Sequence, residues 1–371
     1  MKRVFAFIKR EAVFSVAFLC ALVSAFFVRP DLKYADYIDF GTLFILFSLM
    51  AVVASLRKYG LFDAFAARLC SAVNSLRMLS ALLVALCFFS SMVITNDVAL
   101  LTFVPFALLL LSSAPSNVKM LVVILQTVAA NTGSMLFPIG NPQNLYLFSK
   151  MNCTVFDFMC ILLPYTVASA VLLAVALLFV PNTKMNVAAV CKGGSHRLSY
   201  LRIIPVLALF VLCLLSVMRV VPKSICALAT GGFFIITDRN VLRRVDYMLL
   251  LTFSAFFVFT GNLSRIEPIR MALENAVQGN EILSAVFSSQ IISNVPSALL
   301  LSPFAESIPR LLVGVNVGGL GTLVASLASL ISYKIYSEDK NNQPKKSYLG
   351  WFSVINIVFL AILLLLSAII A

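Results

Sequence analysis

The chain has 371 residues, of which 61% are hydrophobic and only 12% are charged. A water-soluble domain of this length could not keep so much apolar surface away from water, so lipid must be its main solvent. The formal net charge of +13 does not indicate a nucleic-acid partner, because basic residues in membrane proteins usually record orientation. The eight cysteines form no CxxC pair, so we predict neither a disulfide framework nor a thiol metal site.

The first apolar run, at 11–28, follows a basic stretch from Met1 to Arg10 and imitates a signal peptide. More apolar segments follow, so we interpret residues 1–28 as an N-terminal membrane helix. Because a bilayer core needs roughly 20 apolar residues per helix, the whole chain predicts an all-α polytopic membrane protein with about ten to twelve membrane segments. These segments are 11–28, 40–56, 79–113, 118–147, 157–180, 202–220, 223–237, 246–263, 282–305, 310–333 and 349–370.

The segments divide into two related halves. Repeat 1 covers residues 29–180, with a re-entrant helical hairpin at about 79–113 and a broken helix at about 118–147. A cytoplasmic linker at 181–200 leads to repeat 2, residues 201–347, with a hairpin at about 282–305 and a broken helix at about 310–333. Residues 348–371 form a C-terminal membrane helix. Amphipathic stretches at 62–73 and 266–277 precede the hairpins and predict interfacial helices, with simple connecting loops as the alternative.

The basic residues predict the orientation of these segments. If each hairpin returns to the side from which it entered, 20 of the 28 lysines and arginines lie on the same side as the N-terminus. The positive-inside rule assigns that side to the cytoplasm. Hairpins that crossed the membrane would worsen this segregation. We therefore expect a multi-pass protein of the bacterial inner membrane with a cytoplasmic N-terminus, in which the two hairpins open to opposite sides.

The two hairpins share one sequence pattern in register. SSMVITNDVALLTFVPFA begins at Ser90 and SSQIISNVPSALLLSPFA begins at Ser288, a constant offset of 198 residues. In each copy a polar tip, Thr95–Asn96 or Ser293–Asn294, interrupts the apolar run. A segment with a glycine break, NTGS or NVGG, then follows each hairpin. Under the predicted orientation the two repeats are inverted, as in many secondary transporters.

Both tips predict a helix that restarts inside the membrane. Backbone in hydrocarbon must be hydrogen-bonded internally unless it lines a protein cavity, so a polar break in an apolar segment indicates a site. Thr, Ser, Asn and Asp are good N-caps, and Pro296 suits a first helical turn. The free N–H groups and positive dipole ends of two facing helices would bind an anion near the midplane. The predicted substrate-binding residues are Thr95, Asn96, Ser293, Asn294, Asn141 and Pro142.

The segment NTGSMLFPIGNPQNLY, which starts at Asn131, is too rich in Gly, Pro and Asn for a continuous helix. Unwinding would release carbonyls that can ligate sodium together with asparagine side-chain oxygens. The alternative is a kinked helix with satisfied polar side chains. The predicted coupling-ion residues, for sodium or a proton, are Asn96, Asp97, Asn131, Gly133, Gly140, Asn144, Asn316 and Gly318. Sodium is the only metal expected, and no other cofactor is.

Asp97 is the one acidic residue that the predicted segments place deep in the membrane. Such a carboxylate costs several kcal/mol unless it is paired, protonated or metal-bound, so it is a functional candidate by default. It would complete a sodium site or carry the coupling proton. A helix-capping role is the alternative.

Proteins of other classes fit this sequence poorly. His196 is the only histidine, and no HExxH or GxSxG motif occurs, so we predict no catalytic residues. The run GVNVGGLG from Gly314 imitates a dinucleotide loop, but no strand precedes it. The longest polar stretches are too short for a nucleotide-binding domain, so the energy source must be an ion gradient. A channel, unlike a carrier, would conduct without a coupling stoichiometry.

Through ITNDVALLTFVPF, AANTGSMLFPIGNPQNL and ISNVPSALLLSPF the chain resembles the ion transporter superfamily of sodium/dicarboxylate symporters, citrate carriers, arsenite permeases and some sodium/proton antiporters. The resemblance spans about residues 30 to 370 and looks most like the citrate-transporter-like anion permeases. It implies a homodimer, scaffold and transport domains, and an elevator-type movement. The Ser-Asn-Thr tips of the dicarboxylate carriers correspond to Thr95-Asn96-Asp97 and Ser293-Asn294-Val295, and neither is a full match.

These observations predict a secondary transporter of small anions, with citrate or dicarboxylates expected as substrates and sodium or protons as coupling ions. Two alternatives remain open. The Asn-Asp pair at the first tip favours arsenite or antimonite efflux, or sodium/proton exchange, although exchange has only one deep carboxylate available. Three arginines, Arg57, Arg219 and Arg265, are interpreted as snorkelling to the interface and not as substrate ligands.

Overall fold

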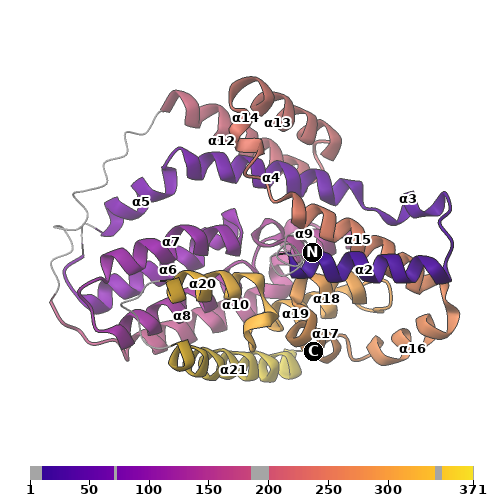
Figure 1. The fold of residues 1–371 in the computed structure, drawn as a ribbon. Coiled ribbons are helices and arrows are strands. Elements are labelled where there is room, and N and C mark those ends of the chain that lie inside the picture. Colours follow the sequence, from indigo (N-terminus) through magenta and orange to yellow (C-terminus); the bar gives the residue numbers. More distant parts are fainter. Residues whose placement is uncertain (1–10, 71–72, 185–199, 339–344, 371) are drawn as a thin grey trace, which may run out of the picture.

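The computed structural model describes residues 11–70, 73–184, 200–338 and 345–370, and the regular elements within these ranges are helices (Figure 1). One isolated bridge joins Ser75 to Lys184. The predicted all-α class is therefore confirmed for the described residues. Most of the predicted linker at 181–200 and the basic N-terminal stretch lie outside them. The predicted division into domains stays a prediction.

The first part of the chain contains a 3-10 turn and nine α-helices among its described residues. They are α2 (Ala12–Phe27), α3 (Lys33–Tyr37), α4 (Phe40–Lys58), α5 (Leu61–Cys70), α6 (Leu76–Ile94), α7 (Asn96–Leu110), α8 (Ser116–Gly133), η1 (Pro138–Gly140), α9 (Pro142–Lys150) and α10 (Val155–Leu177).

The second part repeats this mixture of long and short helices. They are α12 (Tyr200–Val217), α13 (Lys223–Thr237), α14 (Arg239–Leu242), α15 (Tyr247–Arg265), α16 (Glu267–Val277), α17 (Glu281–Ile292), α18 (Asn294–Leu301), α19 (Ile308–Val317), η2 (Leu323–Ala325), α20 (Leu327–Glu338) and α21 (Lys345–Ile370).

Five helices are long and apolar enough to cross a membrane by length and composition: α4, α6, α10, α15 and most of α21. Several shorter apolar helices, among them α7, α12, α13, α17 and α19, accompany them. The predicted segments at 118–147 and 310–333 are each divided into three pieces, because glycine and asparagine, and in the first segment also proline, interrupt the apolar run. The structure thus shows many apolar segments, whereas the predicted number of ten to twelve spans stays a prediction.

Six α-helices start at a residue whose side chain caps them, namely α4, α6, α9, α10, α15 and α19. Asp39 and Asp246 are the N-caps of α4 and α15, where their carboxylates accept the backbone N–H groups of Thr42 and Leu249. Thr154 and Asp157 form a capping box at the start of α10. Such caps satisfy backbone donors that would otherwise be orphaned at a helix start.

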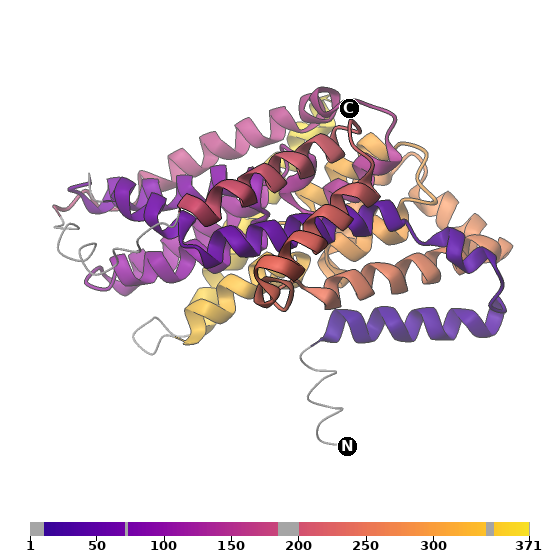
Figure 2. The same cartoon turned by 90° about the horizontal axis from the view of Figure 1, so that it is seen from above.

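The helices form a bundle with two layers that matter for the site. Helix α4 packs against α12, α13 and α14, and Figure 1 shows these four helices together above the rest of the bundle. Below them, α6 packs against α7 and α8, while α17 packs against α18 and α19. Figure 2 shows that most long helices run in roughly one direction, with α2 at one edge, where it packs along α15.

Candidate functional site

The two predicted tips have the same backbone conformation. Helix α6 ends and α7 begins at Thr95, with φ 70° and ψ 148°, and α17 ends and α18 begins at Ser293, with φ 74° and ψ 155°. This combination is nearly restricted to glycine, and a residue held there costs about 1–3 kcal/mol. Both helices restart as predicted. Because two threonine or serine residues are strained alike, 198 positions apart, their conformations must be fixed by surrounding contacts.

The predicted capping of these restarts is not seen. Neither Thr95 nor Ser293 makes a side-chain cap hydrogen bond. At the first tip the Oδ1 of Asn96 instead accepts the backbone N–H of Asp97 at 2.9 Å. At the second tip the Ser293 hydroxyl donates to the Ala325 carbonyl at 3.4 Å. The start of each helix therefore keeps backbone donors that a capping side chain would otherwise occupy.

Each tip helix packs tightly against the glycine of the segment that follows it. A Cβ placed on Gly133 would lie 2.1 Å from the Phe88 carbonyl oxygen and 2.7 Å from Ser91 Oγ. A Cβ on Gly318 would lie 2.9 Å from Val286 Cα and 3.0 Å from Ser289 Oγ. These contacted residues are equivalent in the two sequence copies. Both glycines are therefore required for close approach of the helices.

Replacing Gly133 with alanine is expected to destabilise the protein, because its methyl group would press on the rigid backbone of α6. Overpacking of this kind costs typically about 1–3 kcal/mol. The matched control is Gly232→Ala in α13, where nothing lies within 4 Å of an added Cβ. Thermal unfolding of the purified protein in detergent should show a lower midpoint for Gly133→Ala only. Equal midpoints for the two variants would contradict the close approach.

A buried amide joins the first tip to the other half of the chain. Asn131, at the end of α8, receives two hydrogen bonds on its Oδ1, from Asn96 Nδ2 at 3.1 Å and from Ser326 Oγ at 3.0 Å. Its own Nδ2 donates to Ser329 Oγ at 3.4 Å. Asn96 and Asn131 are 5% and 4% exposed. The predicted pair of tip and broken segment is thus in direct contact, together with two serines at and within α20.

A second buried amide cluster joins the two glycine breaks. Asn141 Nδ2 donates to Asn316 Oδ1 at 3.3 Å, and Asn316 Nδ2 donates to Asn144 Oδ1 at 2.7 Å. Asn144 Nδ2 in turn reaches the carbonyl oxygens of Ser134, Met135 and Phe137. The segment is unwound here and leaves backbone carbonyls outside a helix. Three of these carbonyls already accept the Asn144 side chain. Asn141 also caps α9 through the N–H of Asn144.

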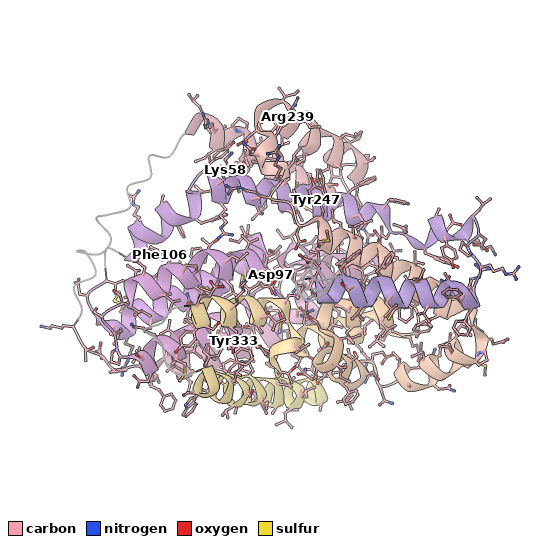
Figure 3. The ribbon with its side chains drawn as sticks, viewed as in Figure 1. Lys58, Asp97, Phe106, Arg239, Tyr247 and Tyr333 are labelled. Carbon is pink, nitrogen blue, oxygen red and sulfur yellow. The ribbon has the colours of Figure 1, made fainter. Side chains whose placement is uncertain are left out.

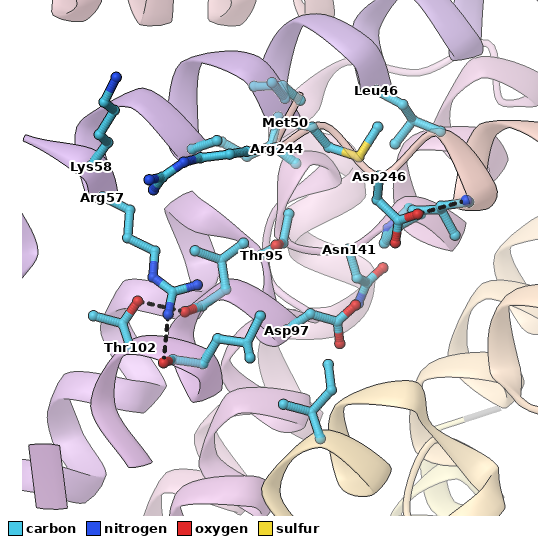
Figure 4. A pocket seen from close by; sticks show the side chains of 18 of the residues that line it. Leu46, Met50, Arg57, Lys58, Thr95, Asp97, Thr102, Asn141, Arg244 and Asp246 are labelled. Carbon is cyan, nitrogen blue, oxygen red and sulfur yellow. Dashed lines mark hydrogen bonds between the residues drawn. The ribbon is translucent and has the colours of Figure 1, made fainter. Parts of the chain in front are cut away.

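A cavity of about 920 Å³, here called the central cavity, lies between α4 and the first tip. Figure 4 shows three basic side chains, Arg57, Lys58 and Arg244, on one side of it. On the other side lie Thr95, Asp97, Asn141 and Asp246. Figure 3 places Asp97 near the middle of the molecule. The cavity therefore runs from residues expected at the cytoplasmic face to the predicted tip.

A smaller cavity of about 310 Å³, here called the side cavity, brings the second tip close to the first. Its wall includes Val295 and Pro296 from the start of α18, and Asp97 and Asp246, which also line the central cavity. The two restarted helices thus border one space, to which Asp97 is common. Ser293 and Asn294 are 2% and 4% exposed and border neither of the two cavities.

The structure places the predicted residues in two groups. Thr95, Asp97, Asn141 and Pro142 line the central cavity. The remaining predicted residues are buried behind it, in the amide clusters or at the close helix contacts: Asn96, Asn131, Gly133, Gly140, Asn144, Asn316, Gly318, Ser293 and Asn294.

Sequence reasoning missed several charged residues of the site. Arg57 was interpreted as snorkelling, but it lines the central cavity and donates to the Leu101 carbonyl of α7 at 2.9 Å. Asp246 adds a second carboxylate to the same space. Asp97 is also not the most enclosed acid, because Glu281 at the start of α17 is 1% exposed and accepts the N–H of Ser307. Glu281 directly precedes the predicted segment 282–305, so the sequence pattern did not indicate that it is buried.

One basic residue of the cavity wall is paired within the layer formed by α4, α12, α13 and α14. Lys58 forms an ion pair with Asp238, next to the Tyr59 hydroxyl. The hydrogen bond from Lys58 holds the pKa of the Asp238 carboxyl below its ordinary value. Among the described residues no three His, Cys, Asp or Glu side chains gather as a metal site.

Comparison with known proteins gives a consistent result. The sequence profile of the citrate transporter family CitMHS matches residues 4–311. An uncharacterized transporter of Methanocaldococcus jannaschii is 32% identical, over 80% of this chain and 81% of its own. The inner membrane protein YbiR of Escherichia coli is 29% identical over 88% of both chains. A 46 kDa membrane protein of Mycobacterium leprae is 24% identical over 80% of this chain and 79% of its own.

Proposed function

The chain belongs to the citrate transporter family and is a multi-pass membrane transporter, and we propose that it carries small carboxylates, such as citrate or dicarboxylates, coupled to sodium or protons. The observation that carries this proposal is the central cavity. It joins three basic side chains to the strained tip at Thr95 and to the start of α9 at Pro142. A cavity of about 920 Å³ has room for a small multivalent anion with its water.

The charges of the cavity suit an anion that enters from one side. Arg57, Lys58 and Arg244 are cationic and line one wall. Arg57 also donates to the Leu101 carbonyl, and Lys58 forms an ion pair with Asp238. A basic wall raises the local concentration of anions and speeds their entry. Deeper in the cavity, the N-terminal ends of α7 and α9 offer positive dipole ends, together with those backbone N–H groups that Asn96 and Asn141 do not already accept. Carboxylate substrates would bind there, next to Thr95, Asn96, Asn141 and Pro142.

One buried amide oxygen beside the amide clusters is available to a coupling ion. Most asparagine oxygens already accept a hydrogen bond, as Asn131 Oδ1 and Asn316 Oδ1 do. Gln143 Oε1, however, is buried at the start of α9 without a hydrogen-bond partner among the described residues. An unused buried oxygen is unfavourable unless something binds it. Sodium would take such an oxygen with nearby carbonyls, whereas a proton would use Asp97.

Transport by an elevator-type movement is part of this proposal. The layer of α4, α12, α13 and α14 would act as the scaffold, and the two tips with their broken segments would move against it. The shared tip conformation and the equivalent glycine contacts support two inverted repeats with re-entrant hairpins. We further propose a homodimer in the bacterial inner membrane, with the N-terminus in the cytoplasm.

The proposal is tested by uptake of radiolabelled citrate, succinate and malate into proteoliposomes. One set carries an imposed inward sodium gradient and another an inward proton gradient. Accumulation under one gradient would establish the carboxylate carrier and identify its coupling ion. No uptake under either gradient would contradict it and favour the arsenite or antimonite efflux, or sodium/proton exchange, that the Asn-Asp tip suggests.

Replacing Arg244 with glutamine is expected to raise the KM for citrate more than the KM for succinate, with little change in Vmax. Exposed charge pairs contribute about 0.2–1 kcal/mol, which corresponds to a KM increase of up to roughly fivefold. The neighbouring Arg243→Gln is the matched control, because Arg243 does not line the cavity. An equal KM change in both variants would remove Arg244 from the substrate path. The effect should shrink at high salt.

A further inference from the structure

Helix α9 has the candidate site at one end and a set of interlayer contacts at the other. Its N-cap Asn141 and first residue Pro142 line the central cavity. Its last turn, Phe148 to Lys150, faces the start of α4 and the turn between α12 and α13. A gap on that side, lined among others by Thr42, Phe148 and Arg219, has a volume of only about 10 Å³. A large cavity therefore lies beside one end of α9, whereas the space beside the other end, here called the closed end, is almost filled.

The first contact at the closed end joins α4 to α9 through hydroxyl groups. Ser149 Oγ donates to Asp39 Oδ2 at 2.9 Å, and Thr42 Oγ1 donates to the same oxygen at 2.6 Å. Burial works against the charged form of Asp39, but these hydrogen bonds and the nearby Lys223 outweigh it, so the pKa of this carboxyl lies below its ordinary value. Asp39 is thus an anion at neutral pH that holds Ser149.

The second contact joins the α12–α13 turn to α9 through one guanidinium. Arg219 Nη2 donates to the carbonyl oxygens of Phe148 at 3.2 Å and Met151 at 2.5 Å, and its guanidinium lies 5.4 Å from the centroid of the Phe148 ring. These carbonyls belong to the C-terminal end of α9, where a positive charge is favourable. A planar guanidinium can reach both at once.

The backbone conformation of Arg219 is unfavourable for an arginine, which indicates that the contacts of its side chain are important. Its φ of 64° lies in the left-handed region, which glycine and asparagine favour. An arginine there is strained, and its contacts with α9 offset that strain. The side chain is also exposed. Water can therefore replace its hydrogen bonds when the two layers move apart, which suits a contact that has to open.

We propose that Arg219 and Asp39 are positioning residues that form a releasable latch on α9, closing the outer side of the transporter while the central cavity is open to the cytoplasm. This inference rests on the proposed alternating access. In each cycle the latch must break so that α9 and its site can move relative to α4 and the α12–α13 turn. Both of its interlayer contacts lie within one helical turn of α9, so they break together.

The latch is tested by joining its two sides. Thr42 Oγ1 and Ser149 Oγ are 3.3 Å apart, so the double variant Thr42→Cys with Ser149→Cys should form a disulfide on oxidation with copper–phenanthroline. Uptake should then be lost and should return on reduction. The oxidised single variants and the oxidised wild type are controls for the native cysteines. Uptake that survives a completed crosslink would overturn the latch, as would the absence of any crosslink.

A second readout does not depend on transport. Adding Arg219→Met to the double-cysteine protein should lower the yield of the crosslink in membranes, and Arg219→Lys should have a smaller effect, because an ammonium keeps the charge but lacks the planar fork. An unchanged yield in Arg219→Met would overturn the role of Arg219. Because the yield needs no substrate, failure of the latch is distinguishable from failure of the carboxylate proposal, in which the wild type itself would show no uptake.

Discussion

Asn96→Ala and Asn294→Ala are each expected to abolish carboxylate uptake while the protein remains folded and expressed. Asn96 binds Asn131 with its Nδ2 and the N–H of Asp97 with its Oδ1, so one amide fixes both the tip and the broken segment. Asn294 lies at the equivalent position, and a Cβ on Gly319 would lie 2.7 Å from its Nδ2. Loss of a buried partner costs about 1–3 kcal/mol. Here the lost contacts are those next to the strained residues Thr95 and Ser293, whose conformations depend on them.

The measurement is citrate uptake per amount of folded protein, determined by gel filtration of the detergent-solubilised variants. Asn262→Ala is the matched control, because Asn262 is also a fully buried amide and donates to Ser24 Oγ at 3.0 Å and Tyr34 OH at 2.9 Å, away from the tips in the α2–α15 contact. It should lose stability but keep its uptake per folded molecule. Tip variants that behave like Asn262→Ala would show that the tips are structural only.

Much of the fold was predictable because local pattern decides it. An apolar run of fixed length gives a helix in lipid, and the predicted segment 223–237 coincides with α13. The two tips could be located to the residue, since a polar pair inside an apolar run is unfavourable in lipid unless it borders a protein cavity. The register of 198 residues between the copies led to Thr95 and Ser293, whose backbones then proved to be strained alike.

The contacts within the site were not predictable, because packing between distant segments determines them. Asn131 binds Ser326 and Ser329, which lie in another part of the chain. The sequence contains a weak signal for this contact. Ser326, Ser329 and Ser332 recur every three residues, from just before α20 into its first half, which places their hydroxyl groups on one helix face. No comparable sequence pattern predicts the basic wall of the central cavity. Arg57 and Arg244 also follow the positive-inside rule, so orientation alone accounted for them.

Asp97→Asn is expected to abolish gradient-driven accumulation while exchange of labelled for unlabelled substrate persists. The Asp97 carboxylate lies where the central and side cavities meet, and the described part of the chain offers it no ion pair or side-chain hydrogen bond. The N-terminal dipole of α7 favours its charge, but only by about 0.3–1 kcal/mol. A charge in such a place invites sodium or a proton. Asparagine keeps the shape of the side chain and removes the group that would respond to the gradient.

Asp246→Asn separates this role from a general effect of charge. Asp246 borders the same two cavities, but it is exposed and caps α15 through the N–H of Leu249 at 2.9 Å. Asparagine is an equally good N-cap, so this substitution removes one negative charge from the cavity and leaves the helix start intact. We expect Asp246→Asn to keep its accumulation under the gradient. If both variants lose it, the cavity needs its net charge and Asp97 has no special part in coupling; if neither does, the coupling ion binds among the buried amides, where Gln143 Oε1 has no hydrogen-bond partner among the described residues.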